Sequence, residues 1–221
     1  AALGTVLRPG PEGQVVTAGG ARWPVVERCG HRFVWFDPAG GPPRFTPSAP
    51  PSEGWTGYLG HDFPLFASHP QETTENAVDV AHFALLHGYR DVRVLEPPVM
   101  AGPVLTVAYA FRRGGLPLRI RIRVEGLGFS RVESRVEPLG IDLSRLVLPT
   151  PVDEARLRLR IAVAARRPWP GPTGRALARL LRRLVLFGYI REVAADIPVW
   201  NAKRYLPRPL AVPGDGPLAQ Y

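Results

Sequence analysis

Two histidines and two acidic residues lie where they could hold a metal ion. Asp79 precedes His82 by three positions, four residues separate His82 from His87, and Asp196 lies near the other end of the chain. Two neutral imidazoles and one carboxylate on one side of a metal form the facial triad that suits ferrous iron, with positions left for dioxygen and substrate. A hydrolytic zinc site also uses two histidines and an acid, so the ligand types leave both metals open.

The spacing of the two histidines constrains the element that carries them. On a regular helix, five positions correspond to a rotation of roughly 140°, too far for His82 and His87 to reach one ion. We therefore expect a bulged or broken helix here, a distortion that tends to occur at functional sites. Asp79 would share the helical face of His82 and could orient its ring. The alternative is that His82 is a packed core histidine and His87 a helix-end histidine.

The segments that carry these residues are both expected to be helical. In residues 70–88, Thr74 is the expected N-cap, since the acidic residues that follow it favour the positive end of a helix dipole. Residues 175–203 predict a long amphipathic helix that packs on a sheet and ends or kinks near Pro198. Its apolar stripe is expected to contain Leu177, Leu180, Leu181, Leu184, Val185 and Tyr189.

The middle of the chain predicts an antiparallel sheet with one solvated face. Apolar and polar residues alternate with a period of two in several segments, and glycines between them predict turns. In residues 118–125 leucine, isoleucine and valine share one face while three arginines point the other way, so the arginine stripe is expected to face water. The segments with this alternation are residues 104–111, 118–125, 129–138 and 155–164.

The first part of the chain, residues 1–54, is rich in glycine and proline. Its one firm prediction is a hairpin in which residues 22–28 and 31–36 flank a turn at Cys29 and Gly30. The proline-rich residues 38–54 predict an extended linker, since proline removes backbone donors and fixes φ.

Composition excludes several classes of protein. A single cysteine excludes an internal disulfide and any cluster that needs two thiolates from this chain. The net charge of +9 comes with one lysine among 28 basic residues, a skew that indicates genome composition rather than nucleic-acid binding. We expect no membrane span and no secretory signal, and hence a cytoplasmic protein. The chain starts at Ala1 rather than at a methionine, as a fragment would.

The residues around the candidate ligands resemble the motifs of a known superfamily. Residues 75–87 resemble the iron-binding motif of Rieske non-haem iron oxygenases, in the branch of the bacterial 3-ketosteroid 9α-hydroxylases and cholesterol 7-desaturases. Residues 196–209 and 214–217 resemble the carboxy-terminal block of that branch. The resemblance implies that a mononuclear Fe(2+) is held by His82, His87 and Asp196. Asp79 would be the bridge through which electrons arrive from a neighbouring subunit, and Asn76 an active-site asparagine near the iron.

This resemblance also implies a fold and an activity. The fold would be α+β, a helix-grip (START-like) domain with a curved antiparallel sheet around a long C-terminal helix. Residues 1–54 would be a remnant of, or linker from, an N-terminal Rieske-type domain, and residues 55–221 the catalytic domain. The implied reaction is dioxygen-dependent hydroxylation or desaturation of a hydrophobic, sterol-like or polycyclic substrate, with electrons from a ferredoxin or reductase, in a homotrimer.

One departure from the family limits this reading. A Rieske [2Fe-2S] cluster needs two cysteines and two histidines in paired loops, and Cys29-Gly30-His31 is interpreted as a chance echo of half of that pattern. The cluster is therefore expected only on a missing segment or a partner chain, unless the protein has abandoned oxygenation. The rival interpretation is a non-redox module of the same fold that binds a hydrophobic ligand. Trp200 is expected to be structural, and Lys203 to be solvated.

Overall fold

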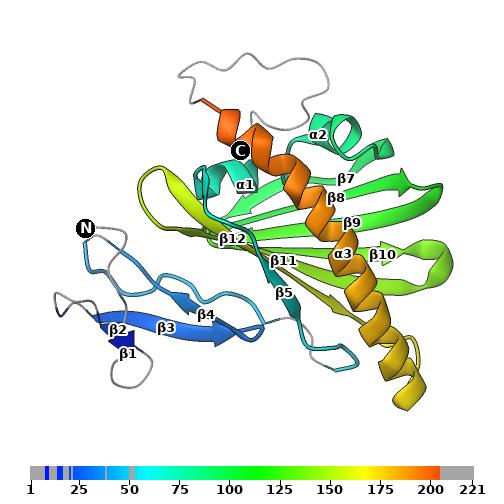
Figure 1. Cartoon of the computed structure of the whole chain (residues 1–221), viewed down its shortest axis with the longest axis horizontal. Coiled ribbons are helices and arrows are strands. Elements are labelled where there is room, and N and C mark those ends of the chain that lie inside the picture. Colours follow the sequence, from blue (N-terminus) through cyan, green and yellow to red (C-terminus); the bar gives the residue numbers. More distant parts are fainter. Residues whose placement is uncertain are drawn as a thin grey trace.

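The core of the protein is an antiparallel sheet with a long helix on one face (Figure 1). The computed structural model describes residues 8–9, 14–16, 20, 22–37, 39–49 and 53–204. In the main sheet the strands follow the order β5-β12-β11-β10-β9-β8-β7, and β6 pairs with β12. Helix α3 packs on β12, while α1 and α2 lie near the C-terminal end of α3. The predicted α+β helix-grip architecture is confirmed.

The elements have the following bounds. A short 3-10 helix covers Glu137–Leu139. The helices are α1 (Pro70–Glu75), α2 (Val80–Leu85) and α3 (Pro172–Ala202), and the strands are β1 (Arg8–Pro9), β2 (Gln14–Val16), β3 (Arg22–Arg28), β4 (His31–Val34), β5 (Leu59–Asp62), β6 (Phe66–Ala67), β7 (Arg90–Ala101), β8 (Val104–Arg113), β9 (Leu116–Glu125), β10 (Phe129–Val136), β11 (Ile141–Pro151) and β12 (Arg156–Ala165).

Alternation in the sequence sets the two faces of the sheet. In β9, Ile120 and Ile122 are buried while Arg119 and Arg121 are exposed, which confirms the predicted solvated arginine stripe. The outer face of the main sheet is not exposed to solvent everywhere, however. Around the buried Phe129, outward-facing side chains of β11 pack against the N-terminal hairpin, so that part of the prediction was wrong.

The N-terminal hairpin forms as predicted. Cys29 and Gly30 both have positive φ, at 56° and 73°, as a tight two-residue hairpin turn requires. Strands β1 and β2 extend this hairpin to a four-stranded sheet, which was not predicted. In the described parts of the predicted linker, 39–49 and 53–54, there is no helix or strand, and Ser48 donates from its backbone N–H to Glu125 Oε2 at 2.7 Å. Whether residues 1–54 derive from a Rieske-type domain stays a prediction.

Helix α3 differs from its prediction in extent and in buried face. It begins at Pro172 and continues through Pro198 to Ala202, so it does not end at that proline, and a kink there stays a prediction. Leu180 and Leu184, predicted in the apolar stripe, are 52% and 61% exposed. Among its buried residues, Ala178, Leu186, Val193 and Trp200 belong to clusters that contain apolar side chains of β12. Gly174 and Asp196 are buried as well.

Strand β7 is the edge of the main sheet and pairs only with β8 among the described strands. Its pairing has three register shifts, and Pro97 and Pro98 lie in its middle. Several of its large apolar side chains are exposed, among them Val94 and Met100. Of the helices in the described ranges, none combines the length and apolarity that crossing a membrane demands.

Candidate metal centre

Residues 70–88, predicted as one helix from a Thr74 cap, form two short helices, α1 and α2, and the N-cap of α1 is His69. The break that the spacing of the two histidines required lies between them, where α2 ends at Leu85. Helix α1 ends at Glu75, and Asp79 lies beyond it with extended backbone angles and accepts a hydrogen bond on Oδ1 from the His82 backbone N–H at 3.1 Å. Asp79 is therefore the N-cap of α2, since its carboxylate satisfies an N–H that has no partner in the first turn of that helix.

The end of α2 brings His87 back toward His82. Helix α2 closes at Leu85, and Gly88 follows with a φ of +67°, a left-handed conformation that glycine adopts without strain. His87 lies on the turn between them rather than on the helix. Because His87 lies beyond the end of α2, its side chain does not follow the helical geometry that would have pointed it away from His82.

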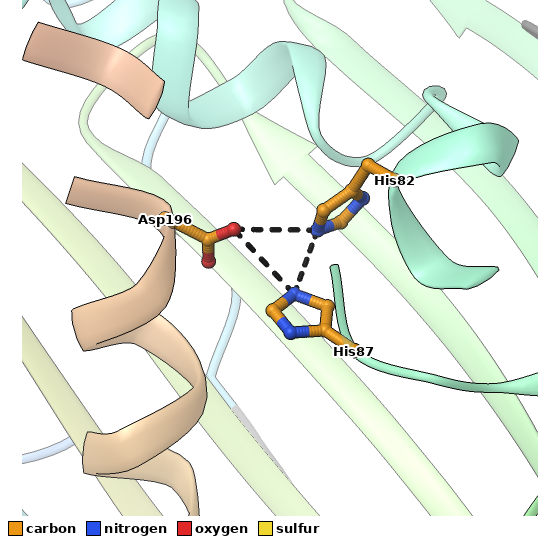
Figure 2. A group of neighbouring side chains, drawn as sticks. All are labelled: His82, His87 and Asp196. Atoms are coloured by element: carbon orange, nitrogen blue, oxygen red, sulfur yellow. Dashed lines mark hydrogen bonds and ion pairs between the residues drawn. The ribbon is translucent and has the colours of Figure 1, made fainter. Parts of the chain in front are cut away.

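The ligand atoms of His82, His87 and Asp196 converge on one point (Figure 2). The two Nε2 atoms are 2.8 Å apart, and Asp196 Oδ1 lies 3.6 Å from Nε2 of His82 and 3.5 Å from Nε2 of His87. A circle through three atoms at these separations has a radius of about 1.9 Å, just under the roughly 2.0–2.2 Å of bonds from a metal to nitrogen and oxygen. The three residues could therefore hold one ion together.

Burial and nearby charges set the protonation of the candidate ligands. Asp196 Oδ1 is buried and has no hydrogen-bond partner in the described residues. Burial, and then the nearby charges of Glu192 and Asp79, raise the pKa of Asp196 to about 7. Burial, helped by His82 and by Arg113 and Arg145, lowers the pKa of His87 to about 4. The imidazole of His87 is therefore neutral at physiological pH, as a metal ligand must be.

His82 is oriented by its own helix cap. Its Nδ1 lies 3.2 Å from the backbone carbonyl of Asp79, to which it donates in the tautomer that leaves Nε2 unprotonated. Burial lowers the pKa of His82, and the carbonyl of Asp79 opposes this only in part. Metal-binding histidines commonly donate their second nitrogen to such a carbonyl, which fixes the ring.

Contacts between α3 and α1 hold Asp196 opposite the histidines. Trp200 is buried, stacks on Phe66 and donates from Nε1 to Asn76 Oδ1 over a long 3.5 Å. Lys203, predicted to be solvated, instead pairs through Nζ with Glu75 at 2.7 Å and with Glu72 at 3.1 Å. That prediction was wrong because the last turn of α3 lies against the acidic side of α1.

A cavity of about 100 Å³ opens beside the three ligand atoms, and Asn76 is part of its lining. Apolar side chains of the sheet form part of its wall, and Arg145, Glu192 and Tyr189 line it as well. The sequence reasoning did not predict a role for these three residues. The sequence contained one indication of this role. Arg145 is a charged residue on the inward face of β11, among mostly apolar residues.

The affinity of this site for a divalent cation is expected to depend on pH through Asp196. Because its pKa is about 7, metal must displace a proton from Asp196 at lower pH. We expect affinity to fall about tenfold for each pH unit below 7 and to level off above it. Equilibrium dialysis with Co²⁺ from pH 5.5 to 8 measures this. An Asp196→Asn variant should bind weakly with a flat profile, whereas a slope of two would mean that both histidines titrate instead.

The chain is similar to known proteins both in sequence and in fold. Residues 34–221 match the model of the 3-ketosteroid 9α-hydroxylase C-terminal domain. The "Probable 3-ketosteroid-9-alpha-monooxygenase, oxygenase component" of Rhodococcus rhodochrous is 26% identical, over 90% of this chain and 54% of that protein. "Cholesterol 7-desaturase nvd" of Hemicentrotus pulcherrimus is 24% identical, over 86% and 45%. The chain thus spans about half the length of these relatives.

Solved structures with the same fold have much lower sequence identity. NdmA of Pseudomonas putida CBB5 with caffeine superposes with a TM-score of 0.66 at 15% identity, over 96% of this chain and 62% of that one. Dicamba monooxygenase bound to dicamba gives a TM-score of 0.55 at 12% identity, over 96% and 71%. At such identities the likeness is one of fold.

Proposed function

Because the chain belongs to the 3-ketosteroid 9α-hydroxylase C-terminal domain family, the catalytic domain of Rieske oxygenases, we propose that it is the iron-bearing half of such an oxygenase. The observation that carries the proposal is the convergence of one carboxylate oxygen and two imidazole nitrogens within 4.8 Å of one another. His82, His87 and Asp196 would hold ferrous iron, which supplies dioxygen activation when bound.

The other residues of the site would orient the ligand His82 and shield the cavity from water. Asp79 fixes the ring of His82 through its carbonyl and is the proposed route for electrons from a cluster outside this chain. Asn76 and Trp200 would line the substrate side of the site. Phe83 and Phe111 would keep the cavity dry, so that the substrate lies against the metal in a low-dielectric space.

The reaction proposed is hydroxylation or desaturation of a C–H bond in a hydrophobic substrate. The names of the two curated relatives favour a sterol-like molecule. A ferredoxin or reductase donor and a homotrimeric assembly belong to the proposal through family resemblance alone, and a cytoplasmic location is carried over from the sequence prediction.

Metal and oxygen dependence test the proposal. Purified without oxygen and supplied with Fe²⁺, the chain is expected to retain about one iron per chain and, with reductant and a cluster-bearing donor, to consume dioxygen. Zinc retained together with dioxygen-independent turnover would indicate a hydrolase instead. A folded protein that binds apolar ligands but no metal would support the non-redox binding module and overturn the oxygenase.

A further inference from the structure

The outer face of helix α3 carries large apolar side chains that nothing in the described chain covers. Leu180, Leu184 and Phe187 are each more than half exposed, and α3 is the outer layer on its face of the main sheet (Figure 1). Their spacing of four and then three positions places them on one line along the helix. A single exposed leucine needs no explanation, but a line of three large side chains indicates a contact surface.

The charges on this face are all positive. Helix α3 contains five arginines and two acidic residues, and the acidic residues, Glu192 and Asp196, both line the cavity at the metal centre. Within the described chain, every ion pair that α3 makes involves one of these two carboxylates. Arg179 and Arg183 are exposed beside the apolar line, and their charges are therefore not neutralised by an ion pair.

A recess of about 330 Å³ lies beside the first half of α3, and arginines form much of its wall. Of the described residues that line it, none is acidic. The arginines are Arg167, Arg175, Arg179 and Arg182. The carboxylate of Glu53 lines two neighbouring cavities instead, together with Arg135 and Arg166. Because guanidinium groups bind phosphate through paired N–H donors, the recess fits a phosphate group.

We propose that the outer face of α3 binds the surface of an anionic phospholipid membrane. Its apolar line would enter the boundary between headgroups and acyl chains, while Arg179 and Arg183 would lie at the level of the phosphates. Trp169, which is exposed and donates to Thr173 in the first turn of α3, is of the type that lies at this boundary. Membrane binding goes beyond the proposed oxygenase activity and does not require iron, although a hydrophobic substrate would itself partition into a membrane.

The charge of this face disfavours a second copy of the chain as its occupant. Arg191 follows Phe187 by one turn on the same line, and its guanidinium lies 5.0 Å from the centre of the Phe187 ring. Two α3 helices packed through this line would bring the arginines of both copies together with no carboxylate between them, and such like-charge contacts cost free energy. An anionic membrane surface attracts every one of these arginines.

Cosedimentation of the metal-free full chain with lipid vesicles tests membrane binding. The chain is expected to bind vesicles of phosphatidylcholine and phosphatidylglycerol at least about tenfold more tightly than vesicles of phosphatidylcholine alone. Leu184→Gln combined with Phe187→Gln should lower the partition coefficient for the anionic vesicles at least about tenfold, because two large apolar side chains leave the interface. Arg179→Gln combined with Arg183→Gln should also lower it at least about tenfold, since each arginine near an anionic surface contributes about fivefold.

Strand β7, at the other edge of the main sheet, supplies the matched controls. Val99→Gln combined with Met100→Gln removes two apolar side chains of similar exposure. Arg90→Gln combined with Arg93→Gln removes two exposed arginines and the same net charge. Both control pairs should change vesicle binding less than about twofold, because they lie outside the contact surface and salt screens distant charges. All the substituted side chains are exposed, so every variant is expected to fold, which circular dichroism checks.

Several results would overturn the inference. Equal losses in the α3 and β7 variants would mean that net charge alone attracts the vesicles. Absence of vesicle binding would leave an acidic protein as the partner of this face, or a soluble phosphate ligand if inorganic phosphate binds in an Arg179-dependent way. Self-association that Leu184→Gln with Phe187→Gln abolishes, measured by light scattering, would make a second copy the occupant.

Iron content, measured separately after anaerobic reconstitution, keeps this inference distinct from the proposed function. Iron retained by a chain that does not bind vesicles removes only membrane binding. Vesicle binding by a chain that cannot hold iron removes the oxygenase and leaves a protein that docks on membranes.

Discussion

Replacing His82 with alanine is expected to abolish iron binding while the fold survives. The loss of one of three ligands should weaken iron affinity by more than about 100-fold, beyond the 10–100-fold typical of groups that only orient a ligand. Folding should survive because the cap on α2 uses the backbone N–H of residue 82, which alanine retains. The lost Nδ1 hydrogen bond should cost about 0.5–1.5 kcal/mol.

Metal analysis after anaerobic reconstitution measures this effect, with circular dichroism as the check on folding. His61→Ala is the matched control, because His61 lies on β5, away from the three ligand atoms, and should leave one iron per chain. A His82→Ala protein that retains iron at the wild-type level would refute the proposed ligand set.

Removal of the Trp200 side chain is expected to have the largest effect on stability. The indole is 4% exposed, stacks on Phe66 and reaches Asn76, so Trp200→Ala leaves a large cavity where α3 meets α1. Truncations of this kind cost about 3–5 kcal/mol. Because Asp196 lies one turn earlier on the same helix, iron affinity should fall as well.

Urea unfolding of the metal-free protein gives the free energy of unfolding for this comparison. Trp169→Ala removes the same side chain from a site that is 48% exposed, and should cost less than about 1 kcal/mol. Equal losses for the two variants would show that Trp200 does not anchor the end of α3.

The sequence predicted those strands that have one buried face and one face exposed to solvent. In β9 every second residue is an arginine, so its pattern alone sufficed. Strand β11 was not predicted because both of its faces are covered, one by α3 and one by the hairpin, and its sequence therefore does not alternate. Strand β7 was not predicted because its two prolines and register shifts obscure the period.

The residues of the candidate site could be predicted from the sequence, but the helix ends and contacts that position them could not. The five-residue spacing of His82 and His87 required a break, yet nothing in the local pattern indicated that α2 would end at Leu85 or that Asp79 would be its N-cap. The place of Arg145 and Glu192 in the lining of the cavity could not be predicted, for a different reason. It depends on β11 and α3 facing one cavity, which brings together residues far apart in the chain.

The edge strand β7 limits how this domain can assemble. An exposed edge of twelve residues would ordinarily offer its free N–H and C=O groups to a strand of another molecule. Here Pro97 and Pro98 supply no N–H donors, and three register shifts bend the strand away from a flat ladder. Continuation of the sheet from one molecule to the next is thus discouraged. Contacts between subunits would then depend on side chains such as the exposed Val94 and Met100, and backbone pairing would contribute little.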